Sequence, residues 1–437
     1  MSTATTAGGF TQEAFETFLS TRDEPAWLTD LRRDAWQQFL QLPMPSHEDD
    51  AWSRTDIRLL RLEQFSLCSS PAEPSPRPAP LLSDGVELGG RLVSVASRPN
   101  HIELDRRWAD QGVLFDSLER CALSHGDLLR PWLERGIVDP KRDRFSALSA
   151  ACWSGGAVLY VPRGVVIDQP LHLEALLPDA GTDLGRTLVV LEEGAEVTLL
   201  DEANSVTEAG SGLHCGIVEL AVGPAARLRY VNLQNWGSRV WHFSHQTATV
   251  DRDAQLQWTI GALGSRLAKV DQYVRLIREG AAAQVNGVMF TEGRQHLAYH
   301  TLQHHAAASC RSDLLYKAAL QDESRTVWQG MIRVDPEAQR TNGYQRNDNL
   351  MLSAHARADS IPGLEIEADD VRCTHGSTSG RIDDEQIFYC QSRGLTRNEA
   401  TRMIVTGFFQ QVFDRITIES VREALGAAIR KRIRQYD

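Results

Sequence analysis

From Gly155 to about residue 355 the chain is a succession of short runs rich in β-branched and apolar residues. Runs at residues 157–161, 187–191 and 217–220 are separated by turn-forming pieces such as Pro162-Arg163-Gly164. Short strands at this spacing, sustained over roughly 200 residues, are typical of a β-sandwich or a β-solenoid. No repeat of fixed period is visible, so the residues alone leave both architectures open.

Helical patterns flank this β-rich stretch on both sides. Phe15, Phe18 and Leu19 are spaced for one face of a helix, and residues 10–42 as a whole predict helices. The prolines at 71, 74, 76, 78 and 80 predict a semi-rigid linker. The predicted organisation is an N-terminal helical region at 1–70, the linker at 71–85, a mixed helical connection at 86–154, a β core at 155–371 and a C-terminal helical region at 372–437.

The C-terminal region predicts three helices. Asp383 is a predicted N-cap, Gly394 a predicted helix stop, and Thr396 with Glu399 a predicted capping box. One mostly apolar face is predicted to contain Ala400, Met403, Ile404, Gly407, Phe408, Gln411, Val412 and Arg415. Such helices can pack on the β unit or present a face to another protein.

Charge and hydropathy exclude several classes of protein. The formal net charge is −12, from 46 basic and 58 acidic residues, which argues against non-specific binding of nucleic acid. No apolar run approaches the ~20 residues that a transmembrane helix needs. The first residues, Met1-Ser2-Thr3-Ala4, do not begin a signal peptide. We therefore expect a cytoplasmic protein without nucleic-acid or membrane partners.

The cysteines are dispersed and include no CxxC pair, which is neither a disulfide framework nor a structural zinc pattern. A reducing cytosol fits best. Because the chain lacks four clustered cysteines, any iron–sulfur cluster that it contacts is expected to be transient or to share its ligands with a partner. The seven positions are Cys68, Cys121, Cys152, Cys215, Cys310, Cys373 and Cys390.

Cys373 and His375 form the most specific candidate site. In an extended chain, side chains two residues apart project from the same face, so this thiol and this imidazole can point at one metal or cluster. Thiolate and neutral imidazole are both competent iron ligands. The alternative is a buried cysteine and a hydrogen-bonded histidine at the end of a strand.

The stretch around Cys373 and His375 resembles the most recognisable part of the SufB/SufD family, the scaffold subunits of the Suf machinery for iron–sulfur cluster assembly. The resemblance extends from about Pro25 to Phe413, and the order and spacing of its motifs make it specific. Further similar pieces are residues 48–56, Leu233-Gln234, 338–341, 349–353 and 362–371.

This resemblance implies a right-handed parallel β-helix between helical ends, acting as a non-catalytic scaffold. It implies a SufB-like paralogue as partner, a SufC-like ABC-type ATPase on the C-terminal helices, and an indirect link to a sulfur donor system. Phe388, Met403 and Phe408 are the residues expected on the ATPase-binding helices. The position of His375 matches an interface residue implicated as a ligand of a transient, shared iron–sulfur cluster, and Cys373 lies beside it.

Within the family, the short chain and Gly376 resemble SufD. The pieces at 388–391 and 403–405 look like SufB, and Asn342 stands where an acidic residue is expected. We therefore expect a SufD-like subunit, with a SufB-like homodimeric scaffold as the alternative.

Other chemistry has less support from the residues. No Walker A sequence is present, so any ATP dependence must come from a partner, and no pattern indicates a flavin. A solenoid enzyme acting on carbohydrate would need paired carboxylates, for which Asp369-Asp370 and Asp383-Asp384 are available. His296, His300, His304 and His305, with Glu292 nearby, form a weaker metal candidate. On a helix, residues 296, 300 and 304 would share a face, and on a strand the even-numbered positions would again align.

Overall fold

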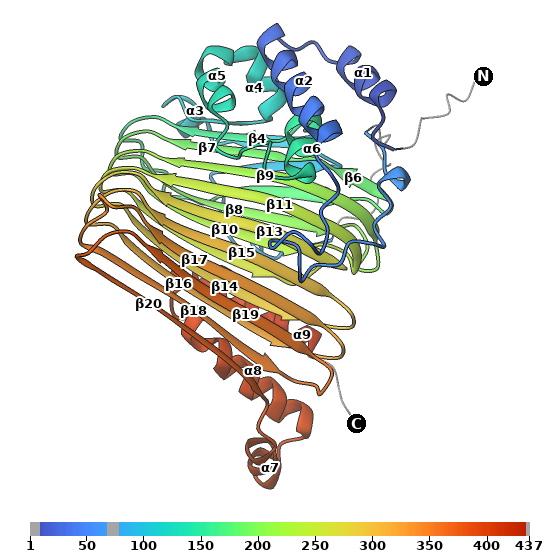
Figure 1. Ribbon diagram of the computed structural model, residues 1–437, viewed down its shortest axis with the longest axis vertical. Coiled ribbons are helices and arrows are strands. Elements are labelled where there is room, and N and C mark those ends of the chain that lie inside the picture. The colour runs from blue at the N-terminus through green and yellow to red at the C-terminus, as the bar shows by residue number, and fades with distance from the viewer. Residues whose placement is uncertain (1–8, 68–77, 434–437) are drawn as a thin grey trace.

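The computed structural model describes residues 9–67 and 78–433, and its centre is a parallel β-solenoid (Figure 1). From β7 onward, successive strands fall alternately into two sheets, and each pairs in parallel with the strand two positions further along the chain. A sandwich would need antiparallel pairs within its sheets. The parallel pairing therefore confirms the predicted β-helix.

The two sheets face each other across a common interior, the lumen. The first sheet contains, in order, β2 (Arg98–Leu104), β1 (Gly90–Val95), β5 (Leu171–Leu177), β8 (Glu196–Ser205), β10 (Arg227–Asn235), β12 (Gln255–Ala262), β14 (Ala282–Thr291), β16 (Arg311–Leu320), β18 (Thr341–Met351) and β20 (Val371–Arg381). The second contains β19 (Arg357–Ile366), β17 (Arg325–Val334), β15 (His296–His305), β13 (Leu267–Leu276), β11 (Arg239–Val250), β9 (Ser211–Val222), β7 (Arg186–Leu191), β4 (Ala157–Val161) and β3 (Leu114–Asp116), while β6 (Gly181–Asp183) pairs with β9.

The length of one turn varies along the solenoid. Arg227, Gln255, Ala282, Arg311 and Asn342 are successive register partners in the first sheet, so the intervals are 28, 27, 29 and 31 residues. Hydrogen bonding keeps the strands in register while the loops between them absorb the difference. This variation explains why the sequence shows no repeat of fixed period.

Large side chains fill the lumen. Tyr230, Trp258, Tyr316 and Trp328 are among the largest fully buried residues and belong to one continuous apolar core between the sheets. The outer faces of both sheets are also covered for much of their length, so many strands are apolar on both sides. At about 25 cal/mol per Å² of buried apolar surface, this burial is the main favourable term for folding.

Helices cover the two sheets at opposite ends of the solenoid (Figure 1). The N-terminal group packs on the outer face of the second sheet, together with Trp52 and Phe65 from the segment after it. It comprises α1 (Gln12–Ser20), α2 (Ala26–Gln41), the 3₁₀ helix η1 (Leu62–Gln64), α4 (Leu118–Ser124), α5 (Gly126–Arg135) and α6 (Arg144–Cys152), whereas the short α3 (Arg106–Ala109) places Trp108 in the lumen core. The C-terminal group is α7 (Asp384–Ser392), α8 (Arg397–Phe413) and α9 (Glu419–Arg432).

Several predicted helix signals are confirmed. The side chain of Asp383 accepts a hydrogen bond from the backbone N–H of Glu385, Thr396 and Glu399 form the capping box, and Gly394 has a φ of +92° just after α7. In this left-handed conformation a side chain would be strained, which is why glycine ends the helix.

Two expectations need correction. The β core continues to Arg381, since β20 covers Val371–Arg381, so the C-terminal helices begin at Asp384 instead of residue 372. The buried face of α8 is also rotated from the predicted one, because Phe409 and Phe413 pack on the first sheet and Met403 is exposed. The buried residues of α8 are Ala400, Val405, Phe409, Val412 and Phe413. Residues 71–77 of the predicted linker lie outside the described residues.

We expect Phe409→Ala to loosen α8 and α9 from the first sheet. Phe409 is fully buried against this sheet, and its truncation leaves a cavity that costs about 3–5 kcal/mol. Amide hydrogen exchange of α8 and α9 measures the local opening free energy directly. Met403→Ala on the same helix is the matched control, since its side chain is 52% exposed and its loss should change exchange little. Equal exchange in both variants would contradict this packing.

Candidate functional site

Cys373 and His375 lie on β20, the last strand of the first sheet (Figure 1). Cys373 packs with Ile332 and Val334, whose side chains face the lumen. By strand alternation, His375 projects to the same side. The expectation that thiol and imidazole share a face is therefore confirmed, although the supporting element is a core strand and not the start of a helical region.

The surroundings of Cys373 keep its thiol protonated. Its register partner on β18 is Gly343, where an added Cβ would lie only 3.2 Å from the Cys373 Sγ. The absence of a side chain at Gly343 thus makes room for the sulfur. Partial burial raises the pKa of the Cys373 thiol. The thiolate therefore needs a metal or another positive charge to form at neutral pH.

The lumen is open at this end of the solenoid. Leu364 and Ile366 of β19 are 36% and 39% exposed, whereas their register partners Ile332 and Val334 on the preceding turn are fully buried. His375 is exposed as well, beside its buried register partner Gln345, whose Oε1 accepts no hydrogen bond from the described residues. Lumen positions that are buried in the preceding turns, both apolar and polar, are thus exposed to solvent in this last turn.

The predicted partner-binding residues of the C-terminal helices fall into two environments. Phe388 on α7 is 72% exposed and Met403 on α8 is 52% exposed, and Tyr389 adds a third large side chain to this surface. Phe408, by contrast, is partly buried: it packs on Phe409, and the Lys317 Nζ lies 4.7 Å from its ring centroid. Only Phe388 and Met403 of the predicted three are available to another molecule as large exposed side chains.

The histidines near residue 300 do not converge on one point. They lie on β15, where His305 faces the lumen and donates or accepts at Ser312 Oγ, 2.8 Å away. By alternation the even-numbered three share the outer face, as predicted, yet their partners differ. His300 Nδ1 lies 3.7 Å from Asp271, and His304 Nε2 lies 2.9 Å from Asp335. This arrangement gives no common metal site for the four.

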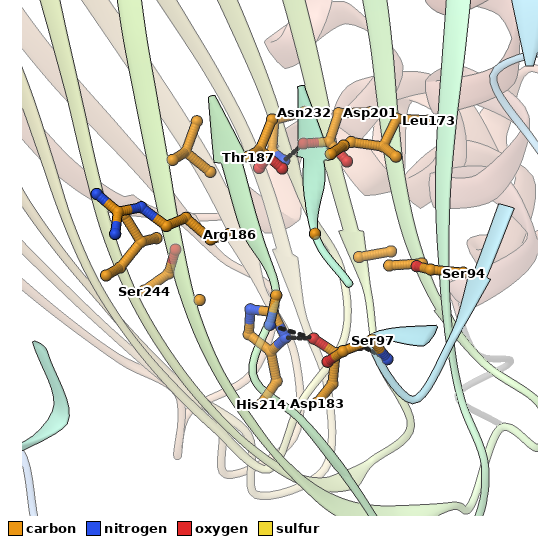
Figure 2. A pocket seen from close by; sticks show the side chains of 18 of the residues that line it. Ser94, Ser97, Leu173, Asp183, Arg186, Thr187, Asp201, His214, Asn232 and Ser244 are labelled. Carbon is orange, nitrogen blue, oxygen red and sulfur yellow. Dashed lines mark hydrogen bonds and ion pairs between the residues drawn. The ribbon is translucent and has the colours of Figure 1, made fainter. Parts of the chain in front are cut away.

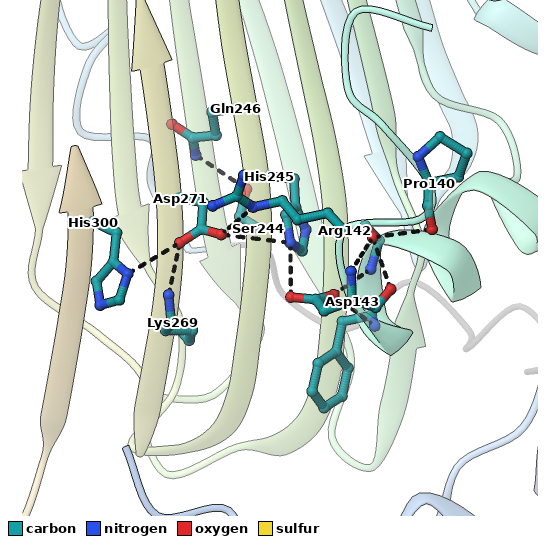
Figure 3. A network of polar contacts seen from close by, with 11 residues as sticks. Pro140, Arg142, Asp143, Ser244, His245, Gln246, Lys269, Asp271 and His300 are labelled. Carbon is teal, nitrogen blue, oxygen red and sulfur yellow. Dashed lines mark hydrogen bonds and ion pairs between the residues drawn. The ribbon is translucent and has the colours of Figure 1, made fainter. Parts of the chain in front are cut away.

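A polar network that the sequence did not indicate lies between α6 and the second sheet (Figure 3). Ligand-type atoms of Asp143, His245 and Asp271 all lie within 4.8 Å of one another. The Asp271 carboxylate, however, is already 2.6 Å from Lys269 Nζ and 2.7 Å from Arg142 Nε.

These two cations decide what the network does. Burial alone would raise the pKa of Asp271, but Lys269 and Arg142 outweigh it and hold that pKa far below its usual range. A divalent ion would meet two positive charges at this carboxylate. The network is therefore an ion-pair connection between the N-cap of α6, Asp143, and strands β11 and β13.

A second polar cluster lines a small cavity inside the first turns of the solenoid (Figure 2). The cavity measures about 70 Å³, enough for several water molecules. On one side His214 Nδ1 lies 3.1 Å from Asp183, and on the other Asn232 donates to Asp201. Burial raises the pKa of Asp201 to about 6, so this carboxyl titrates near neutral pH.

Comparison with known proteins identifies the family. A family model described as the SUF system FeS cluster assembly, SufBD core domain, matches residues 178–408, more than half of the chain. A second, the SufBD protein N-terminal region, matches residues 14–173. The chain belongs to the SufBD family.

Individual relatives cover most of the chain. An iron-sulfur cluster assembly SufBD family protein of Mycobacterium leprae is 36% identical over 297 residues, which is 66% of this chain and 74% of that protein. The Bacillus subtilis iron-sulfur cluster assembly protein SufD is 27% identical over 428 residues, or 97% of this chain and 98% of its own length. SufB of the same organism is 25% identical over 430 residues, covering 94% and 90%. This SufBD protein is thus similar to both subunit types.

Two further observations concern the family member as a whole. Among the helices in residues 9–67 and 78–433, none combines the length and the apolar character needed to cross a bilayer. The networks around Asp271 and Asp201 both contain contacts between residues more than 25 positions apart, between the α6 segment and β13 in the first and between β8 and β10 in the second. No local motif could have indicated either one.

Buried histidines should make the stability of this SufBD protein fall as the pH drops below about 6.5. Burial lowers the pKa of His296 and His305 to about 4 and that of His300 to about 3. The unfolded chain therefore binds protons at these histidines at a pH where the folded chain does not. Each histidine lowers the free energy of unfolding by up to about 1.4 kcal/mol per pH unit, until the pH falls to its folded pKa. Asp201, whose pKa is raised, offsets part of this loss below pH 6.

The test is urea unfolding at several pH values between 7.5 and 5 for the wild type and His305→Gln. Removing this lumen histidine should reduce the slope of unfolding free energy against pH by about one proton. His101→Gln, at an exposed position of the edge strand β2, is the control for replacing a histidine by glutamine. An identical slope in all three proteins would show that His305 is not buried in its neutral form.

Proposed function

We propose that this chain is a SufD-like, non-catalytic scaffold subunit of an iron–sulfur cluster assembly complex. In this proposal its open end meets a SufB-like paralogue, and His375, with Cys373 beside it, is presented to the nascent cluster. The cluster is cargo, transient and shared with the partner. The observation that supports this proposal most directly is the exposure of lumen-facing groups at β19 and β20.

The two ends of the solenoid support an interface at β20. At the N-terminal end the edge strand β2 has only 7 residues and carries Pro99, which discourages pairing with another chain. At the other end β20 is an edge strand of 11 residues without proline or carboxylates. A long polar edge of this kind can accept a strand from a partner. The same partner would cover Leu364 and Ile366.

Ligand chemistry supports His375 as the primary group. It is exposed on the side of β20 that faces the open lumen, so its imidazole can reach a cluster without rearrangement of the core. Cys373 is half-buried with a raised thiol pKa, and binding of iron would supply the positive charge that its thiolate needs.

The C-terminal helices support a second contact. Phe388, Tyr389 and Met403 form an exposed apolar surface on α7 and α8, at the end of the molecule where β20 lies (Figure 1). Exposed aromatic and methionine side chains are enriched in protein interfaces. We assign this surface to a SufC-like ABC-type ATPase. Because α8 packs on β14 and β16, and α9 packs on α8, a force on the ATPase side would reach the β core.

Compartment and subunit type complete the proposal. Free thiols at all six cysteines that the structure describes fit the reducing cytoplasm. Similarity to SufD and to SufB is nearly equal, so a SufB-like homodimer is the competing assignment. Native mass of the co-expressed proteins separates the two, since only the SufD-like subunit requires a paralogue.

We expect His375→Ala to abolish or strongly reduce cluster content while leaving the complex assembled. The wild type and the variant are co-expressed with their SufB-like and SufC-like partners, purified without oxygen, and assayed for iron, sulfide and visible absorption. Loss of an exposed imidazole removes a ligand but little packing. The matched control is Thr374→Ala, the neighbouring exposed residue on the opposite face of β20.

Unchanged iron and sulfide in the His375→Ala complex would refute the ligand role. Loss of cluster in the Thr374→Ala control would instead indicate that β20 as a whole was disturbed. Failure of the chain to associate with any paralogue would refute the SufD-like assignment and favour the SufB-like homodimer.

A further inference from the structure

An outward-facing groove on the first sheet is separate from the open end. It lies over β10, β12, β14, β16 and β18, beside the connection between α8 and α9, and encloses about 650 Å³. Small-molecule sites in proteins typically measure about 300–1,000 Å³. Its floor is made by side chains from neighbouring strands in the same register, and Arg415 and Thr417 of the α8–α9 connection form one wall.

The groove is positively charged although the protein is acidic. Four arginines line it, Arg227, Arg229, Arg311 and Arg415, against the lining carboxylate Asp313 and the adjacent Glu196, which gives a formal local charge of +2. The whole chain has a formal net charge of −12. Such a local excess of one sign in a concave site raises the local concentration of ligands of the opposite sign.

Two of these arginines are already paired and two are available. Arg229 lies 2.9 Å from Glu196, and Arg415 lies 2.9 Å from Asp313. The Arg227 side chain is 57% exposed, and its distance of 3.9 Å from the Glu196 carboxylate is at the limit for an ion pair. Arg311 forms no ion pair with any residue in the described ranges, and its side chain is exposed. An anion can therefore engage Arg227 and Arg311 without displacing a close partner.

The two available arginines are well separated within the groove. Arg227 is on β10 and Arg311 on β16, three strands apart in one register row, which corresponds to roughly 14 Å at about 4.8 Å per strand. Between them the floor carries the amides of Gln255, Gln257 and Gln284. Gln257 donates to the Gln284 side chain at 3.0 Å and to the Arg415 carbonyl at 2.9 Å, so these amides are held in place.

From this arrangement we propose that the groove binds a small elongated polyanion, with a phosphate or carboxylate group at each end and a polar body between them. The guanidinium forks of Arg227 and Arg311 would each engage one anionic end. The side-chain amides of Gln255 and Gln284 would hydrogen-bond the body, since Gln257 already donates to Gln284 and to the Arg415 carbonyl. The volume of the groove fits one such molecule. The two separated arginines would favour a ligand with two anionic groups over a ligand with one.

Calorimetric titration of the isolated chain at low salt tests this site. Fructose 1,6-bisphosphate provides two phosphates on a polar body, citrate provides carboxylates, and inorganic phosphate provides a single anion. We expect the bisphosphate or citrate to bind at least ten-fold more tightly than phosphate. Whichever of the two binds identifies the preferred anionic group.

Arg311→Gln and Arg227→Gln should each weaken that binding at least ten-fold, and both side chains are exposed enough for the fold to tolerate the change. The matched control is Arg294→Gln, an 84% exposed arginine outside the groove, which should bind like the wild type. Equal affinity for phosphate and for the two larger anions, or binding that neither groove variant weakens, would overturn the proposal. Because no partner protein is present, this result is independent of cluster assembly.

Discussion

Parallel pairing of strands from successive turns is the interaction on which the rest of this structure depends. Each turn satisfies its backbone groups only through the turns before and after it, and each buries its lumen side chains only beneath a neighbour. A stack of this kind cannot terminate without cost. At the N-terminal end antiparallel β2 and β3 close the sheets, but at the other end β19 and β20 leave both an edge and the lumen exposed. The need to cover that end links the fold to assembly.

The same constraint explains where the candidate ligands lie. In the interior turns, the lumen positions equivalent to Cys373 and His375 are sealed by the next turn, as Gly343 and Gln345 are. Only on the terminal strand can a lumen-facing residue reach another molecule. A partner that covers this end would therefore meet these two side chains in an environment that is already partly desolvated, where metal–ligand and charge interactions are stronger than in water.

Much of this architecture could be predicted from the sequence, for identifiable physical reasons. Helix caps at Asp383 and Thr396 depend on residues within one turn, and the shared face of Cys373 and His375 depends on strand alternation alone. The residues alone do not decide between a solenoid and a sandwich, because turns of 27 to 31 residues hide the repeat. Only the family resemblance favours the solenoid.

What could not be predicted depends on contacts between distant residues. The buried face of α8 is set by the first sheet, so Phe409 faces inward and Met403 outward although both fit a helical pattern. The predicted start of the C-terminal helical region is too early because the Gly- and Ser-rich stretch of β20 has weak strand propensity. Pairing of β20 with β18 overrides that propensity. The Asp271 network arises from packing of the α6 segment on the second sheet, and the arginine groove arises from register between strands; no single-sequence pattern encodes either contact.

Backbone hydrogen exchange of β20 tests the central claim most directly. The account predicts that amides of Val371–Arg381 exchange rapidly in the isolated chain and become strongly protected in the complex with the SufB-like partner, because the free edge and the open lumen are covered together. A stable complex in which exchange at β20 is unchanged would contradict the account and place the partner elsewhere on the molecule.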